Sequence, residues 1–173
     1  MKRKNQLEKI LSRTDFWNSE TGSHSKRVAD KLALCSSDLR MDKELLHKAG
    51  LLHDVGKTQV DQAVLYKPGR LTYTEKAVVA KHTQKGKILL KSENQQIRRA
   101  ASQHHSVSKK QGLWLQVLHL IDIEDAVRNN RVYRAAMPEE KAQKVLTEEC
   151  ARMNERAVRI FWRHYQEFTA MNS

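Results

Sequence analysis

Apolar residues recur along most of this chain at intervals of three or four positions, which is the spacing of one face of an α-helix. No segment of the sequence shows the strict alternation of apolar and polar residues that marks a half-buried strand. We therefore expect an all-α fold, a helical bundle of about seven to eight helices joined by short connections. The expected helices cover residues 5–13, 23 onward for at least three turns, 42–56, 74–91, 93–105, 113–130, 138 onward and 152–168.

Residues with known preferences for helix ends support several of these boundaries. Asp42 is a typical N-cap, and Thr74 is placed to cap the helix that follows it. We expect Gly56 to end one helix and Pro138 to occupy the first position of another. The connections between these helices are the segments 15–22, 58–71 and 106–112.

The length and composition suit one folded unit. The chain has 173 residues with only 6 glycines and 2 prolines, and it is rich in residues that favour helices. We therefore expect a single domain over residues 1–173. The final helix, 152–168, carries a wide aromatic stripe that includes Phe161, Trp162 and Tyr165. Core packing is the favoured role of this stripe, and a homodimer or partner interface is the alternative.

Cysteine usage and the N-terminus bear on the compartment. Cys35 and Cys150 lie far apart and form no CxxC motif, so we expect reduced thiols in a cytoplasmic protein. The basic start Met1–Lys4 is not followed by the apolar segment of a signal peptide. No apolar run is long enough to cross a membrane, so we expect no membrane-spanning segment.

The chain carries a formal net charge of +12. Such a charge favours anionic partners, namely nucleotides, nucleic acids or acidic lipid headgroups. The basic residues are spread along the chain rather than gathered in one arm, so we expect most of them to form a solvated surface. General nucleic-acid binding therefore has only the overall charge in its support.

The most informative segment is Leu51–Lys57, in which an apolar run delivers His53 and Asp54 side by side and then stops at Gly56. A metal site that handles phosphate needs a neutral nitrogen ligand, an oxygen ligand able to bridge two cations, and a fixed positive charge. Lys57 supplies that charge, although a lysine at a helix end also interacts favourably with the helix dipole.

Further candidate ligands lie on other expected helices. Glu20 and His24 are four residues apart and share a face if their helix reaches back to Glu20. A carboxylate inside the apolar run 118–123 is costly to bury unless it is paired or bound to metal. The remaining candidates are His82, the tandem pair His104-His105, and Asp122 within that apolar run.

Taken singly, a histidine is more often a surface or hydrogen-bonded core residue than a metal ligand. We expect His47 and His164 to lie outside the site. We group His119 with them, although its position three residues before Asp122 would allow it to contact a metal-ligating side chain. Asp125, one turn after Asp122, is the best candidate for a residue that does not bind the metal itself but holds a metal-ligating side chain by a hydrogen bond.

Taken together, these residues indicate a site for two cations. Nitrogen and oxygen ligands without cysteine favour manganese or non-haem iron over zinc, nickel or magnesium. Asp54 is the candidate bridge between two cations about 3.5–4 Å apart, which would bind a phosphodiester and acidify a water. Lys57 is expected to neutralise the charge of the phosphate.

In sequence, the chain resembles the HD-superfamily phosphohydrolases, specifically the HD-GYP branch of cyclic-dinucleotide phosphodiesterases. The likeness covers a motif-bearing core of about residues 19–150 and leaves the final helix, 152–168, outside it. The similar segments are Glu20–Val28 (ETGxHxxRV), His53–Lys57 (HDxGK), Leu65–Glu75 (LxKPGxLTxxE), His82–Leu89 (HTxxG), His104-His105 (HH) and Asp122–Arg134 (DxxDAxxxxRxYR).

The resemblance implies a centre of two or three divalent cations, iron or manganese, and a cyclic dinucleotide as the substrate. Cyclic di-GMP or a related 3′,5′-linked molecule would be hydrolysed through a metal-bridged hydroxide. Asp54 and Lys57 would be catalytic, Lys57 would contact the scissile phosphate, and Arg131 and Arg134 would bind the dinucleotide. The implied metal ligands are His24, His53, Asp54, His82, His104, His105 and Asp122, with Glu20 serving a third metal.

The segment after the tandem histidines departs from the family pattern. The Gly-Tyr-Pro signature after the tandem histidines is absent, and Asp122 follows His105 by only 17 positions. No expected ligand is missing, so we expect metal binding to survive, whereas loss of the segment is expected to alter substrate preference and to weaken activity. A dinucleotide receptor, a protein-interaction module and a phosphohydrolase for a different nucleotide are the alternatives. No receiver or sensor domain is present in this sequence, so we expect regulation by a protein partner in trans or by substrate level.

Overall fold

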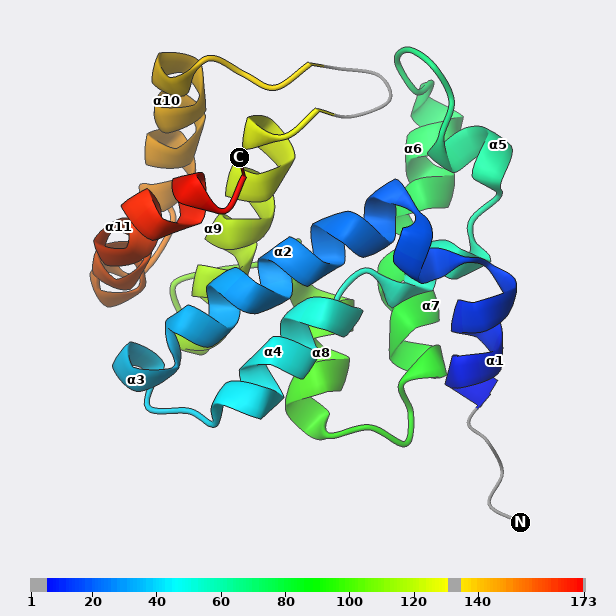
Figure 1. The fold of residues 1–173 in the computed structure, drawn as a ribbon, viewed down its shortest axis with the longest axis horizontal. Helices are drawn as coiled ribbons and strands as arrows, with labels where there is room; N and C mark the ends of the chain where they lie inside the picture. The colour runs from blue at the N-terminus through cyan, green and yellow to red at the C-terminus, as the bar shows by residue number, and fades with distance from the viewer. Residues whose placement is uncertain (1–5, 131–134, 173) are drawn as a thin grey trace.

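The computed structural model describes residues 6–130 and 135–172, and these residues form a helical bundle without strands (Figure 1). The predicted all-α class is confirmed. The chain is divided more finely than predicted because several helices are short. The α-helices are α1 Gln6–Arg13, α2 Glu20–Leu34, α3 Ser36–Leu39, α4 Lys43–Leu52, α5 Gln62–Leu65, α6 Tyr73–Ala80, α7 His82–Leu89, α8 Gln95–Gln103, α9 Leu113–Arg128, α10 Glu139–Cys150 and α11 Glu155–Ala170, with 3₁₀ turns η1 Phe16–Asn18 and η2 Val55–Gln59.

Helix α2 begins earlier than predicted. The connection expected over 15–22 is wrong, because η1 and the first turn of α2 occupy it. The Ser19 hydroxyl accepts a hydrogen bond from the Gly22 amide over 3.1 Å and so caps the helix one residue before Glu20. Glu20 and His24 therefore do lie one turn apart on the same helix.

The segment that carries the His-Asp pair also differs. Asp42 caps α4 as predicted, by accepting from the Leu45 amide over 2.7 Å. The helix ends at Leu52 rather than at Gly56, and Gly56 lies inside η2. A Cβ atom at Gly56 would lie 1.9 Å from the carbonyl oxygen of His82. Glycine is thus required here by the close approach of η2 to α7, not by the end of a helix.

The helix predicted over 74–91 is in fact two helices, α6 and α7, which are separated at Lys81. Thr72, not Thr74, provides the cap, through a capping box with Glu75. The segment 58–71 is not wholly irregular, because it contains the single turn α5. Pro138 immediately precedes α10 instead of occupying its first position.

Helices α2 and α9 pack against each other near the centre of the bundle, α4 packs on α2, and α8 packs on α4 (Figure 1). The side chains of Leu32, Leu46 and Leu118 are fully buried between these helices. At one end of the molecule, α10 and α11 pack on α9. Phe161 and Phe168 of α11 are fully buried, so core packing of the aromatic stripe is confirmed for these residues.

Cys35 and Cys150 are buried free thiols. In the part of the chain that the structure describes, no helix combines the length and apolar character needed to cross a bilayer. The basic start Met1–Lys4 lies outside the described residues.

Candidate metal centre

The predicted ligands come from five separate parts of the chain and meet where the ends of several helices converge. His24 lies in the second turn of α2, His82 opens α7, and Asp122 lies in the third turn of α9. His53 and Asp54 directly follow α4, and the tandem pair 104–105 directly follows α8. Two groups of ligand atoms result, each gathered within 4.8 Å: Asp54, His82, His104 and His105 form one, and His24, His53 and Asp122 form the other.

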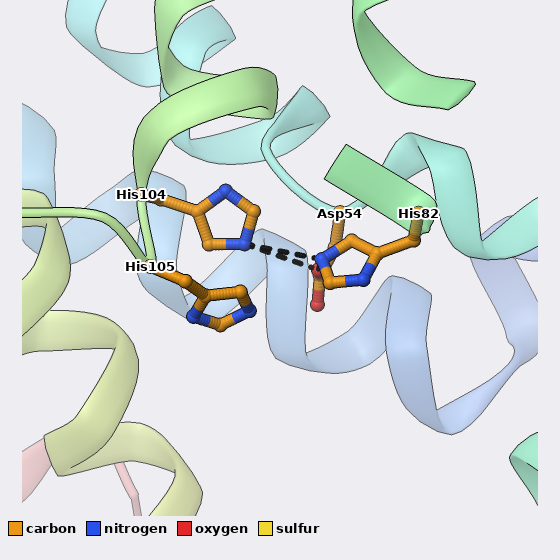
Figure 2. A group of neighbouring side chains, drawn as sticks. All are labelled: Asp54, His82, His104 and His105. Carbon is orange, nitrogen blue, oxygen red and sulfur yellow. Dashed lines mark hydrogen bonds and ion pairs between the residues drawn. The ribbon is translucent and has the colours of Figure 1, made fainter. Parts of the chain in front are cut away.

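The carboxylate of Asp54 belongs to the first group, beside His82 and His104 (Figure 2), and it also lies close to histidines of the second. Its Oδ1 atom lies 3.3 Å from Nε2 of His82 and 3.6 Å from Nε2 of His104. Its Oδ2 atom lies 3.5 Å from Nε2 of His53 and 3.8 Å from Nε2 of His24. One oxygen thus faces each group, which is the arrangement that a bridging carboxylate requires.

Asp122 joins the groups on the side nearer to solvent. Its Oδ1 atom lies 3.0 Å from Nε2 of His24 and 3.6 Å from Nε2 of His53. Its Oδ2 atom lies 3.9 Å from Nδ1 of His105, whose side chain is 48% exposed. The cluster is therefore closed by buried histidines on most sides and open beside His105.

Backbone carbonyls hold three of the imidazoles in one orientation. Nδ1 of His53 donates to the Gly50 carbonyl over 2.6 Å, and Nδ1 of His82 donates to the Val79 carbonyl over 2.7 Å. Nδ1 of His104 donates in the same way to the carbonyl of residue 100 over 2.8 Å. A carbonyl can only accept, so Nδ1 of each ring carries a proton, and Nε2 is the ring atom that faces the cluster.

His24 is held by a carboxylate instead. Its Nδ1 atom donates to Oδ2 of Asp125 over 2.7 Å, so its Nε2 atom faces the site. Asp125 is fully buried and also accepts two hydrogen bonds from Arg27, over 2.8 and 2.9 Å. A carboxylate that accepts from a ligating histidine fixes the tautomer and the orientation of the ring, and this support role of Asp125 stays a prediction.

Burial and charge act in opposite directions on the ionisable groups. Burial alone raises the pKa of Asp54, but the Lys57 ammonium and the His53 ring outweigh it and hold this pKa well below its usual value. Burial lowers the pKa of His53, yet the neighbouring carboxylates, Asp54 first, raise it to about 10. The pKa of His105 falls to about 3 through desolvation and the nearby His104. The His105 ring is thus neutral, as a metal ligand must be.

The donor set fits divalent cations. Nε2 of His53 and Oδ1 of Asp54 are buried and have no hydrogen-bond partner among the described residues. Buried polar atoms without partners are costly, and a cation between these lone pairs would satisfy both. Imidazole nitrogen and carboxylate oxygen are both donor types that divalent cations bind in proteins.

Lys57 lies on η2, one turn after Asp54, and its Nζ atom donates to Oδ2 of Asp54 over 2.5 Å. Glu20, at the start of α2, belongs to neither group of ligand atoms, and its service to a third metal stays a prediction. Arg131 and Arg134, predicted to bind substrate, lie outside the described residues.

Sequence reasoning undervalued His119. Its Nδ1 atom donates to the His104 carbonyl over 2.7 Å, and its Nε2 atom lies 3.3 Å from Glu149. The hydrogen bond anchors the peptide that joins the tandem histidines, and the spacing of three residues from Asp122 was the available signal. The other two discounted histidines contact surface carboxylates instead: His47 pairs with Asp30 and His164 with Asp38.

A family of known proteins matches the part of the chain that contains this cluster. The HD domain family matches residues 21–151, which is most of the chain and spans all the predicted ligands except Glu20.

The chain belongs to the HD domain family.

The HD-family membership predicted from the motifs is confirmed. Over 144 residues the chain is 36% identical to the 3′3′-cGAMP-specific phosphodiesterase 3 of Vibrio cholerae, covering 74% of this chain and 31% of that protein. Over 125 residues it is 30% identical to a cyclic di-GMP phosphodiesterase of Vibrio cholerae, covering 61% of this chain and 25% of that protein. The chain thus spans about a third or less of the length of these curated relatives.

Among solved structures, the HD domain of the L. monocytogenes phosphodiesterase PgpH is similar, with a TM-score of 0.62. The match covers 95% of each chain at 17% sequence identity. At this identity the likeness shows a shared fold alone.

Proposed function

We propose that this HD domain is a metal-dependent phosphodiesterase that hydrolyses a cyclic dinucleotide, cyclic di-GMP or a related 3′,5′-linked molecule. The observation that carries the proposal is the position of Asp54, whose two oxygens face two separate groups of imidazole nitrogens. The names of the relatives, which act on 3′3′-cGAMP and cyclic di-GMP, supply the class of substrate.

Each group of side chains would hold one divalent cation, with Asp54 shared between them. One cation would be held by His82, His104 and His105, and the other by His24, His53 and Asp122. When bound, such a pair of cations lowers the pKa of a water molecule and offsets the charge of a phosphodiester. The net reaction is the addition of water to phosphorus and the breaking of the bond to the 3′ oxygen, which leaves with a proton.

The protein contributes orientation and a fixed charge to this reaction. Hydrogen bonds from Nδ1 to carbonyls or to Asp125 keep the Nε2 atoms of these histidines directed at one place, so the rings need not turn when a cation binds. Lys57 is only 20% exposed, and its ammonium lies beside the bridging carboxylate. The ammonium is therefore positioned to stabilise the negative charge that develops on the phosphate oxygens during the reaction. Arg131 and Arg134 would bind a phosphate of the dinucleotide or the edge of a guanine base.

A receptor without turnover is the second candidate. The observation in its favour is the short connection between α8 and α9, residues 104–112, where the HD-GYP pattern has a longer segment. A shorter segment leaves fewer residues to enclose the substrate. Under this alternative the domain would bind a dinucleotide and act on a protein partner in trans.

The deciding experiment is a turnover assay under anaerobic, reducing conditions with Mn²⁺ or Fe²⁺. Cyclic di-GMP, 3′3′-cGAMP and linear dinucleotides would be incubated with the wild type and with Asp54→Asn. Asp30→Asn is the matched control, because Asp30 is an exposed aspartate whose partner is His47. Hydrolysis by the wild type and the control but not by Asp54→Asn supports the enzyme. Tight dinucleotide binding with no product from any protein would favour the receptor.

A further inference from the structure

A lysine is fully buried in the centre of the bundle. Lys31 lies on α2, two turns after His24, and its side chain has no exposed surface. Its Nζ atom donates to Glu124 Oε2 over 2.6 Å, to Asp125 Oδ1 over 3.1 Å and to Asn172 Oδ1 over 2.6 Å. All three ammonium protons therefore have acceptors, which offsets the cost of burying the charge.

The third acceptor comes from the end of the described chain. Asn172 follows α11, and its amide group bridges two helices. Its Oδ1 atom accepts from Lys31 and from Nδ2 of Asn129, the latter over 3.1 Å. Its Nδ2 atom donates to Oε1 of Glu124 over 2.7 Å. The turn after α11 is thus tied by side-chain hydrogen bonds to both α2 and α9.

The same cluster reaches the metal centre through Asp125. Oδ1 of Asp125 accepts from Lys31 and Arg27, and Oδ2 accepts from Arg27 and from Nδ1 of His24. Lys31 is fully buried, whereas the Arg27 side chain is 27% exposed. Lys31 is therefore the more rigid of the two cations that hold the carboxylate behind His24.

We propose that Lys31, Glu124 and Asn172 form a positioning relay that fixes Asp125, and through it the ring of His24. The relay couples the turn after α11 to the affinity of the site for divalent cations. The inference rests on the proposed metal centre but not on the proposed reaction. Residues that support a ligating histidine directly change metal affinity by about 10- to 100-fold. Lys31 acts one contact further away, so we expect about 3- to 10-fold.

A purely structural role makes a different prediction. Replacing a buried ion pair by apolar residues of similar volume often leaves stability unchanged or raises it. The double variant Lys31→Met with Glu124→Met removes both buried charges and leaves Arg27 and Asp125 in place. Under the relay, metal affinity falls even where the melting temperature is maintained. Under a structural role, the melting temperature alone changes.

The test is titration of the apo protein with Mn²⁺ by calorimetry, together with thermal melting of the metal-free protein. We expect the dissociation constant of the double variant to rise by about 3- to 10-fold. Lys48→Met with Glu93→Met is the matched control, because these residues form a surface ion pair, with 2.7 Å between Nζ and Oε2, and neither belongs to the groups of ligand atoms. An Mn²⁺ affinity of the Lys31/Glu124 variant equal to that of the control would overturn the proposal. Bound Co²⁺ gives a second readout, since a shifted His24 ring alters its visible absorption.

Asn172→Ala tests the remote end of the relay, and it leaves the buried ion pair intact. We expect weaker Mn²⁺ binding, and we expect no further loss when Asn172→Ala is added to the Lys31/Glu124 double variant, since residues of one network are not additive. An unchanged affinity of Asn172→Ala, or a full additional loss in the triple variant, would remove Asn172 from the relay.

The failure of this inference can be distinguished from failure of the proposed function. A wild type that binds no Mn²⁺ would overturn the metal centre and the relay together. A wild type that binds Mn²⁺ but hydrolyses no dinucleotide would overturn the reaction alone, and the comparison of dissociation constants would still decide the relay.

Discussion

Nζ of Lys57 donates to Oδ2 of Asp54 over 2.5 Å, and the two residues are separated by a single 3₁₀ turn. The charge expected to meet a phosphate is therefore paired with the carboxylate expected to bridge two cations. Cations at Asp54 would compete with the ammonium for this oxygen. An ammonium released from Asp54 in this way would be available to a phosphate bound at the cations.

Lys57→Met should separate metal binding from catalysis. Lys57 belongs to neither group of ligand atoms, so the Mn²⁺ content of the variant should equal that of the wild type. The loss of a fixed charge at the transition state should lower kcat by about 100- to 1000-fold. Elemental analysis and dinucleotide turnover on the same preparation measure both. Loss of metal from this variant would mean that the lysine holds Asp54 in place instead of binding phosphate.

Asp54→Asn should remove metal and activity together. An amide offers one oxygen and no charge, so it cannot bridge two cations as the carboxylate does. We expect substoichiometric Mn²⁺ and no detectable hydrolysis, while circular dichroism stays helical. The surface variant Asp30→Asn should keep full metal content and turnover. A fully metallated Asp54→Asn protein would show that the groups around His82 and His24 bind cations independently of the bridge.

The residues of the cluster could be predicted from the sequence because they are polar residues within or at the end of apolar segments. Asp122 is a carboxylate in an apolar helix, and His53 with Asp54 ends an apolar run. Such residues need partners, and their order matches one family. The orientation of the rings was not accessible, because it depends on carbonyls such as that of Val79, which only the fold brings beside Nδ1 of His82.

The errors in the predicted fold have local causes. Ser19 caps α2 within a segment whose polar composition is equally typical of a connection. The break at Lys81 has no glycine or proline to mark it. Lys31 and Glu124 pair across two helices, so the burial of both charges follows from tertiary packing that no local pattern reports. The presence of most helices could therefore be predicted more reliably than their boundaries. A buried pair such as Lys31 and Glu124, which joins two helices, could not be predicted from the sequence.

Metal binding should strengthen as the pH rises. Neighbouring carboxylates overcome burial and raise the pKa of His53 to about 10, so a proton occupies Nε2 at neutral pH and must leave before a cation binds. Below this pKa, affinity for Mn²⁺ should increase by up to about tenfold per pH unit. Calorimetry in buffers of different ionisation enthalpy would measure the released proton. An affinity that is flat between mildly acidic and mildly basic pH would show that the ring is already neutral.

Arg131→Ala should raise KM for the dinucleotide and leave metal content unchanged. A guanidinium suits a phosphate or a guanine edge, and neither contact involves the cations. Steady-state kinetics with elemental analysis would check both quantities, and Arg40→Ala, an exposed arginine after α3, provides a control. Metal loss from the Arg131 variant would place this arginine near the ligands instead of the substrate.

Gly56→Ala should damage the site through the backbone. The added Cβ atom would lie 1.9 Å from the His82 carbonyl oxygen and 2.6 Å from the Gly86 amide nitrogen, so η2 and α7 would have to separate. Overpacking of this kind costs about 1–3 kcal/mol, and the displaced His82 should weaken Mn²⁺ binding as well. Gly69→Ala is the contrasting variant, because Gly69 has a φ of +100° but open space around its Cβ position. It should cost about 1 kcal/mol through backbone strain and leave metal affinity unchanged. Equal melting temperatures and equal Mn²⁺ affinities for the two variants would contradict the role assigned to the contact between Gly56 and α7.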